Sequence, residues 1–221
     1  MVPNRLCQLG IRDEVTLFNP IPVGLCKALY PHRLWEVPKT WNSGPWLTFD
    51  DGPDPIATPE VLGILEEFEV KAYFYCNGKQ IERHPDLFRA ILDAGHCVGN
   101  HGWDHLDGWN TSTRAYLENA IQNEHLVESN WYRPPYGRLT RSQERALTGR
   151  GYKIAMWSIM AEDWRDGESG LSCARRVLKH LGPQSIVVWH TNEKSRARVG
   201  VGLRHLLAET PYKFGMPKHT A

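Results

Sequence analysis

Two adjacent carboxylates, Asp50 and Asp51, follow the apolar run of residues 46–49 and precede Gly52-Pro53. At the end of an extended strand, successive side chains point to opposite sides of the chain. One carboxylate can therefore coordinate a metal ion while its neighbour accepts a proton, and the Gly-Pro pair turns the backbone away. An acidic turn without catalytic function has the same sequence, so this segment alone does not identify a site.

Two histidines four residues apart, His101 and His105, supply a residue type that often binds transition metals. Imidazole suits Zn²⁺, and the same ligands accept Co²⁺ or Ni²⁺. Two histidines and one carboxylate leave coordination positions open, which is typical of a catalytic metal site rather than a structural one. The alternative interpretation is a pair of surface histidines.

Arg133 precedes the rigid pair Pro134-Pro135 and then Tyr136. An arginine held in this way can fix a carboxylate through charge-assisted hydrogen bonds. Proline has no backbone N–H, so the N–H of Tyr136 is the donor left to face a developing oxyanion. By itself the segment is also compatible with a plain proline-rich turn.

Asp163 and His190 each follow an apolar stretch near the end of the chain. An acid beside a histidine sets its tautomer and raises its pKa, so that the imidazolium can act as a general acid. A histidine that ends an apolar strand can also be purely structural. We predict that Trp164, Trp189 and Pro134 contact a saccharide, although bulky core packing is the alternative role for tryptophan.

Strands and helices alternate along the chain, which predicts a parallel sheet and favours a single-domain α/β fold, a distorted (β/α) barrel. We expect strands at residues 46–50, 71–76, 97–99, up to 133, 152–158 and 185–190. Helices are expected at 24–30, from Thr58-Pro59 with Thr58 as the N-cap, and at 85–94, 113–129, 140–150, 169–181 and 199–210. The candidate catalytic residues all follow strand ends, which meet on one face of such a barrel.

The composition is that of one globular domain of 221 residues, with 26 basic and 25 acidic residues and no basic stripe. This balance argues against nucleic acid as a partner. No apolar run is long enough to span a membrane, and no secretory signal precedes the domain, so we expect cytoplasmic residence. The five scattered cysteines fit a reducing compartment. We predict an extended lead-in at 1–45 packed on the domain, a catalytic domain at 46–214 and a tail at 215–221.

Taken in order, the segments TFDDGP (48–53), NHGWDH (100–105) and RPPYG (133–137) resemble motifs of the NodB-homology polysaccharide deacetylases, carbohydrate esterase family 4. The resemblance extends over residues 46–210 and implies the distorted (β/α) barrel of that family. By position, it implies that Asp50 is the catalytic base, Arg133 its partner, Asp163 the residue that orients the general acid His190, Tyr136 the oxyanion donor, and Asp51, His101 and His105 the metal ligands, with Zn²⁺ the expected metal.

Two motifs depart from the family pattern. The usual Asp-x-x-Asp-Trp begins here with Met160, and the usual Leu-x-His reads Val188-Trp189-His190. These changes leave the catalytic set intact and bear on the substrate. The expected function is hydrolysis of N-acetyl groups on a peptidoglycan- or chitin-type saccharide. The alternatives are an O-acetyl esterase of the xylan type, a cyclic amidase, or a non-catalytic carbohydrate-binding protein.

Overall fold

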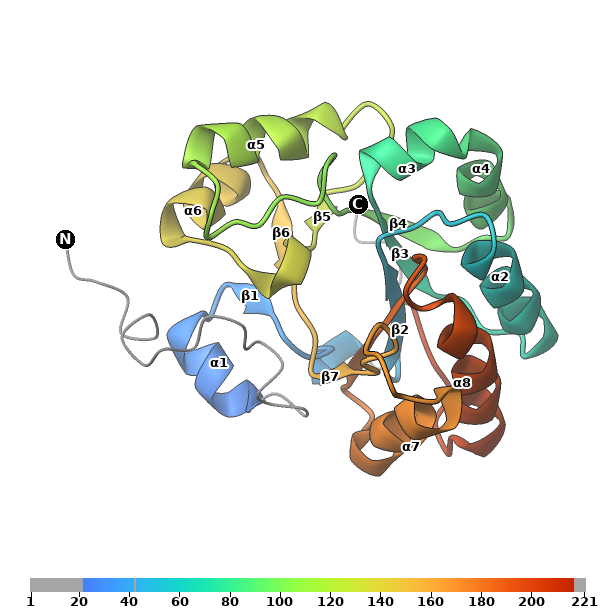
Figure 1. Cartoon of the computed structure of the whole chain (residues 1–221). Coiled ribbons are helices and arrows are strands. Elements are labelled where there is room, and N and C mark those ends of the chain that lie inside the picture. Colours follow the sequence, from blue (N-terminus) through green and yellow to red (C-terminus); the bar gives the residue numbers. More distant parts are fainter. Residues whose placement is uncertain (1–21, 42, 217–221) are drawn as a thin grey trace.

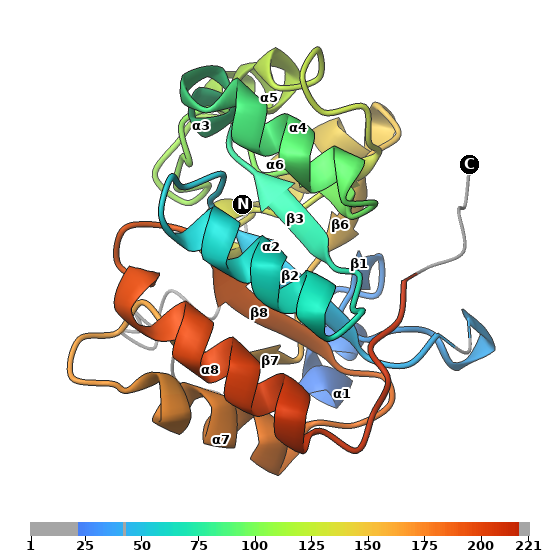
Figure 2. The same cartoon turned by 90° about the vertical axis from the view of Figure 1, so that its right-hand side faces the viewer.

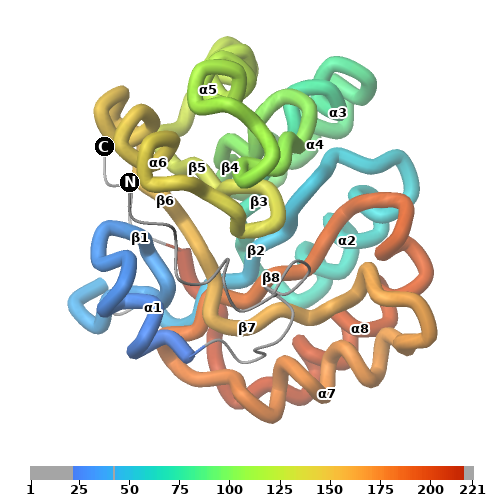
Figure 3. The backbone as a smooth tube through the Cα atoms, turned by 60° about the vertical axis from the view of Figure 1, so that its left-hand side comes forward, coloured from blue at the N-terminus to red at the C-terminus, as the bar shows by residue number. Residues whose placement is uncertain are grey.

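The strands of the protein form one parallel sheet that curls into an open barrel. The computed structural model describes residues 22–41 and 43–216 (Figure 1). The strands are β1 (Arg33–Leu34), β2 (Trp46–Asp50), β3 (Tyr73–Cys76), β4 (Cys97–Asn100), β5 (Trp131–Tyr132), β6 (Lys153–Ala155), β7 (Ile159–Met160) and β8 (Ile186–His190). Their order in the sheet is β1-β6-β5-β4-β3-β2-β8-β7, so the barrel is open between β1 and β7 (Figure 3). The expected distorted (β/α) barrel is confirmed.

Helices surround the outer face of the sheet. They are α1 (Val23–Leu29), α2 (Ala57–Glu67), α3 (Gly78–Arg83), α4 (Pro85–Asp93), α5 (Thr113–Gln122), α6 (Arg141–Gly149), α7 (Gly170–His180) and α8 (Arg196–Glu209), with short 3₁₀ helices η2 (Lys39–Trp41) and η3 (Pro135–Gly137). Figure 2 shows α2, α8 and α7 side by side over β2 and β8. No helix among the described residues has the length and apolar character needed to cross a membrane.

On the central strand β2, alternation divides the side chains between two core clusters. Leu47 and Phe49 belong to the cluster under α2 and α8, whereas Trp46 belongs to a second cluster that also includes residues of α5 and α6. Both faces of the sheet are therefore buried, as is usual for parallel strands covered by helices. Because side chains alternate, Thr48 and Asp50 share the inner face with Trp46.

The start of α2 differs from the prediction. Thr58 is not the N-cap, because the helix already begins at Ala57. The Asp54 carboxylate accepts hydrogen bonds from the backbone N–H groups of Ile56 and Ala57 at 3.0 and 2.8 Å. The Thr58 hydroxyl instead accepts from the backbone N–H of Asp54. Asp54 therefore satisfies the free N–H groups that every helix start leaves.

The predicted strand at 152–158 ends early, because β6 covers only Lys153–Ala155 and the chain then crosses to β7 (Ile159–Met160) at the far edge of the sheet. After β6 the backbone N–H of Met156 donates to the Leu34 carbonyl, whereas the N–H of Ser158 donates to the Ile186 carbonyl. Leu34 is on β1 and Ile186 is on β8, so the chain crosses the barrel between these two bonds. An apolar run alone could not indicate this crossing.

The predicted lead-in contributes to the sheet, because β1 pairs with β6 through Arg33 and Leu34. The short helix expected at 24–30 is found as α1. The boundaries at 45 and 214 stay a prediction, and residues 1–21 and 217–221 lie outside the described residues. The four described cysteines, Cys26, Cys76, Cys97 and Cys173, are free thiols, and Cys7 lies outside the described residues.

Candidate active site

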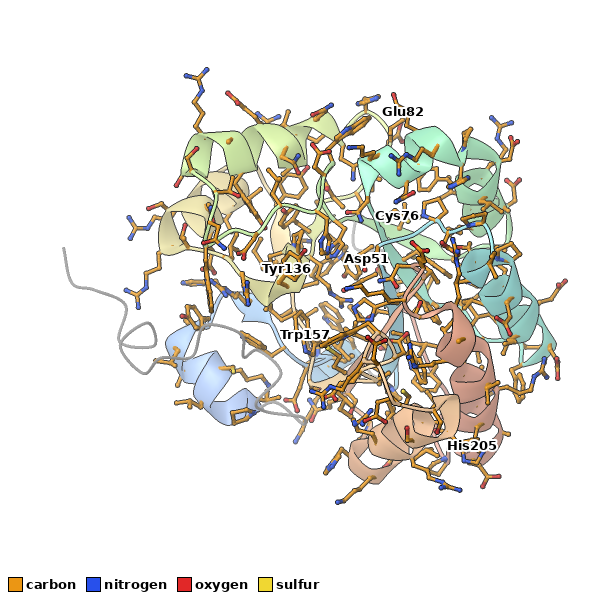
Figure 4. The ribbon with its side chains drawn as sticks, viewed as in Figure 1. Asp51, Cys76, Glu82, Tyr136, Trp157 and His205 are labelled. Atoms are coloured by element: carbon orange, nitrogen blue, oxygen red, sulfur yellow. The ribbon has the colours of Figure 1, made fainter. Side chains whose placement is uncertain are left out.

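The polar residues that follow the strands lie together at the carboxyl end of the sheet. Asp50 and His190 are register partners on the adjacent strands β2 and β8, so their side chains emerge side by side. Arg133 directly follows β5 and bonds to Asp50, which brings a third strand to the same place. In Figure 4, Asp51 and Tyr136 lie within the ring of helices, while Glu82 and His205 lie toward its edge.

Arg133 is completely buried, and its guanidinium group makes a fixed set of contacts, one of them to Asp50. Its Nη1 donates to Asp50 Oδ1 at 2.7 Å and to Thr48 Oγ1 at 2.7 Å. Its Nη2 donates to the carbonyl of Met156 at 3.0 Å, and its Cζ lies 4.0 Å from the centre of the Tyr75 ring. A guanidinium that is bonded on two sides and stacked on a third cannot turn, so it fixes the orientation of the Asp50 carboxylate.

Asp51, His101 and His105 form a group whose potential metal-ligand atoms all lie within 4.8 Å of one another. The Nε2 atoms of His101 and His105 lie 3.3 and 3.0 Å from Asp51 Oδ1. His101 Nδ1 is 2.8 Å from the carbonyl oxygen of Arg133, which can only accept, so Nδ1 carries the proton. Nε2 is therefore the His101 nitrogen left to face the Asp51 carboxylate, an arrangement suited to a cation held between them.

The charge of Asp51 also suits a metal ligand. Burial would raise the pKa of Asp51, but the facing imidazole rings of His101 and His105 outweigh burial and hold that pKa well below its usual value. Asp51 is therefore a carboxylate at neutral pH. Its Oδ1 has no conventional hydrogen-bond partner although it is buried, which is the condition of an atom reserved for a ligand. The residues present thus fit a divalent metal ion.

Asn192 is a site residue that the sequence analysis missed. Its Nδ2 donates to Asp51 Oδ2 at 2.6 Å, so it orients the carboxylate from the side opposite the histidines. Ser195 holds this turn in place, because its backbone N–H donates to Asn192 Oδ1 at 3.0 Å and its hydroxyl donates to the His190 carbonyl at 2.7 Å. The only signal for Asn192 in the sequence is its position just after a strand end.

Asp163 and His190 make the predicted pair. His190 Nδ1 is 2.8 Å from Asp163 Oδ1, and the His190 backbone N–H donates to Asp163 Oδ2 at 2.8 Å. Burial lowers the pKa of His190, but the charge of Asp163 and its hydrogen bond outweigh burial and raise that pKa to about 9. The negative charges of Asp51 and Asp50 add to the rise. His190 is therefore an imidazolium at neutral pH and can donate a proton.

Four described residues at the site have left-handed backbone conformations that non-glycine residues rarely adopt. The φ angles are 76° for Asp51, 56° for His105, 57° for Tyr136 and 60° for Glu162, which precedes Asp163. Such conformations cost energy and persist where the surrounding structure enforces them, often at functional sites. They also explain why strand patterns could not predict these turns.

Two of the three predicted saccharide contacts are wrong. Trp189 is completely buried and packs against Gly202 of α8, because alternation on β8 turns it outward while His190 faces inward. Pro134 is also buried and therefore offers little surface to a ligand. Trp164 is partly exposed beside Asp163, so its contact with a saccharide remains a prediction.

A cavity of about 400 Å³ opens beside Asp51 and His105 and also has Asn77 and Asn192 in its wall. A larger groove of about 710 Å³ lies between α2 and α8 and includes none of the predicted site residues. The chemistry described above is therefore associated with the smaller cavity.

The segment of the chain that carries Asp50, His101 and Arg133 matches a known protein family. Residues 42–155 match the polysaccharide deacetylase family. One peptidoglycan-N-acetylglucosamine deacetylase of Bacillus cereus is 32% identical over 161 residues, which cover 67% of this chain and 58% of that protein. Another from the same organism is 33% identical over 184 residues, which cover 79% of this chain and 84% of that protein.

The fold is also similar to solved structures. That of the Bc1960 peptidoglycan N-acetylglucosamine deacetylase, in complex with a naphthalenyl N-oxidanyl-benzamide, matches with a TM-score of 0.73 at 26% identity. The match covers 80% of this chain and 86% of that one. The chain thus spans a little over half of one relative and most of the other two.

Proposed function

Because this chain belongs to the polysaccharide deacetylase family, we propose that it hydrolyses N-acetyl groups of an amino-sugar oligo- or polysaccharide with the help of a divalent metal. The observation that carries the proposal is one ligand group flanked by two separate acid–base pairs. The ligand group is Asp51, His101 and His105, and the pairs are Asp50–Arg133 and His190–Asp163. The two Bacillus cereus relatives are named for peptidoglycan N-acetylglucosamine, which makes this class of glycan the substrate that we propose.

Asp51, His101 and His105 would hold the metal, and Zn²⁺ is the ion we expect, with Co²⁺ or Ni²⁺ as alternatives. A bound divalent ion would lower the pKa of a water molecule to about 7 and polarise the acetamide carbonyl. Two histidines and one carboxylate would leave coordination positions open for the water molecule and for the acetamide carbonyl oxygen. Asn192 supports this ligand set by fixing the second oxygen of Asp51.

The chain's own groups would then move two protons. Asp50, oriented by Arg133, accepts a proton from the attacking water, whose oxygen bonds to the carbonyl carbon. The backbone N–H of Tyr136 stabilises the negative charge that develops on the carbonyl oxygen. The carbon–nitrogen bond breaks as His190, paired with Asp163, donates its proton to the leaving nitrogen. The products are acetate and a free amino sugar.

Acetate release from a panel of substrates tests this proposal. The panel holds N-acetylglucosamine oligomers, peptidoglycan fragments and acetylated xylan, each assayed with Zn²⁺ and then with a chelator. Zinc-dependent release from the N-acetyl substrates is the expected result. Release from xylan alone would instead identify an O-acetyl esterase, and metal-independent release would contradict the ligand assignment.

The base assignment is tested by Asp50→Asn, with Asp86→Asn on the exposed start of α4 as the matched control. Loss of a general base lowers turnover by about 10²- to 10⁴-fold. We expect this loss in the Asp50 variant with its zinc content unchanged, and no loss in the control. Activity within a few-fold of the unmodified protein in the Asp50 variant would refute the assignment.

A further inference from the structure

Two aromatic rings are exposed on the protein surface next to the candidate active site. Among the Phe, Tyr and Trp side chains of the described residues, the exposed ones are Trp109 at 45% and Tyr136 at 52%. Apolar area left in water is unfavourable, and most rings in the part of the chain that the structure describes are at least partly covered. Two exposed rings close together at a catalytic site therefore indicate a surface that a ligand covers.

Both rings face the same guanidinium group. The Cζ atom of Arg138 lies 5.0 Å from the centre of the Trp109 ring and 5.6 Å from the centre of the Tyr136 ring. On its other side, Tyr136 meets the His105 ring edge-on, with centroids 4.4 Å apart. The aromatic surface is therefore continuous with the proposed metal site through His105. Cation–π contacts of this kind hold rings in position.

The loop that carries Trp109 is fixed from several directions. The backbone N–H of Trp109 donates to Asp107 Oδ1 at 2.9 Å, and Gln143 Nε2 donates to the Gly108 carbonyl at 2.7 Å. Gly108 lies so close to the chain at Arg138 that a Cβ atom would be 2.2 Å from the Arg138 carbonyl oxygen. The rings are therefore positioned before a ligand arrives, which keeps the entropic cost of binding low.

From this arrangement we propose that Trp109 and Tyr136 form a stacking surface for the sugar residues next to the one that is deacetylated. The inference rests on the proposed function and adds to it which side chains of this protein contact the rest of an oligomeric substrate. A pyranose ring presents a face of C–H groups, and packing this face on an aromatic ring removes apolar area of both from water.

The charges at this surface favour an uncharged saccharide. Arg138 Nη1 lies 2.6 Å from Asp107 Oδ2, so the guanidinium charge is already balanced by a carboxylate. A polyanionic ligand would have to compete with Asp107 for Arg138. A neutral chain of N-acetylglucosamine residues meets no such competition and is the probe we choose.

The test compares Trp109→Ala with the unmodified protein on the N-acetylglucosamine monomer and tetramer. Trp109→Phe keeps a ring, and Leu92→Ala is the matched control, because Leu92 is similarly exposed at 44% but lies on α4. We expect Trp109→Ala to raise KM for the tetramer about tenfold, with kcat and the low activity on the monomer unchanged. Trp109→Phe should recover most of the affinity, and Leu92→Ala should match the unmodified protein.

Direct binding separates this inference from the proposed function. Calorimetric titration of the tetramer into the Asp50→Asn protein, with and without Trp109→Ala, measures Kd without turnover. Equal Kd values in the two proteins would overturn the stacking surface and leave the deacetylase proposal intact. An equal loss on monomer and tetramer would also overturn it, because a stacking surface beside the site does not reach a single sugar. Absence of acetate release by the unmodified protein would count against the function alone.

Discussion

Replacement of Asp163 by asparagine should move the pH dependence of turnover to lower pH. His190 has an ordinary pKa of 6.5, and its environment raises that pKa to about 9. At about 1.4 kcal/mol per unit, this rise corresponds to roughly 3 kcal/mol in favour of the imidazolium. Burial acts in the opposite direction, and the two largest of the effects that raise the pKa are the charge of Asp163 and its hydrogen bond. Without the Asp163 charge, burial should leave the pKa of His190 near or below 6.5.

The consequence for activity follows from the role of His190 as a proton donor. On the alkaline side of the profile, kcat/KM of the unmodified protein should fall about tenfold for each pH unit above the pKa of His190. A bound metal ion would cancel part of the Asp51 contribution, so this fall should begin at or somewhat below about pH 9. In Asp163→Asn it should begin below neutral pH.

The assay is acetate release from N-acetylglucosamine oligomers between pH 5 and about pH 10, with saturating Zn²⁺. Asp166→Asn is the control, because Asp166 lies three residues further along but is fully exposed. NMR titration of the His190 imidazole gives an independent value for the same pKa. If Asp163→Asn left the alkaline limb in place, either His190 would not be the acid or Asp163 would not tune it.

The pairing also links stability to pH. The pKa of His190 is raised in the folded state, so its contribution is complete below the unfolded value of 6.5. It is lost as the pH rises from there through about 9. Asp163→Asn should therefore lower the melting temperature most at acidic and neutral pH and least above pH 9.

Three further predictions concern the rest of the site. Arg133→Met leaves the buried Asp50 carboxylate without its partner and should lower the free energy of unfolding by about 3–5 kcal/mol. Urea denaturation measures this change, and a loss below about 1 kcal/mol would contradict the pairing. Asn192→Ala removes a hydrogen bond to a proposed metal ligand and should weaken Zn²⁺ binding about 10- to 100-fold. The Kd for Zn²⁺ is measured by competition with a chromophoric chelator, and an unchanged Kd would refute the role of Asn192. Chelation of the metal should abolish acetate release and lower the melting temperature, and added Zn²⁺ should restore both; full activity after complete chelation would exclude a metal role.

The site combines rigid buried pairs with an exposed approach. Arg133 and Asp163 are completely buried, and each holds one acid–base group through hydrogen bonds at 2.7–2.8 Å. Tyr136 and Trp109, by contrast, are open to solvent. Such a division suits the proposed reaction, in which the acid and base groups must be held in place while a saccharide chain enters from the surface.

The sequence by itself determined the alternation of strands and helices and the residue types that follow the strand ends. β2 was predicted with its observed limits, and the position of Asp50 and His190 after apolar runs indicated the catalytic face. These features are local, because hydrophobic periodicity and turn residues depend on neighbours a few positions away. The adjacent acids were also expected to diverge, and Asp50 indeed turns to Arg133 while Asp51 turns to the histidines.

Only the tertiary structure decided which side chains meet. Side chains alternate along β8, so His190 points into the site and Trp189 points into the core under the helices. The sequence could not show which of the two would face the site, because both faces of the strand are buried. The bond from Asn192 to Asp51 joins residues 141 positions apart, and that from Arg133 to Asp50 joins residues 83 positions apart. Such contacts depend on strand order and register, which arise when distant segments pack together, so no local pattern encodes them.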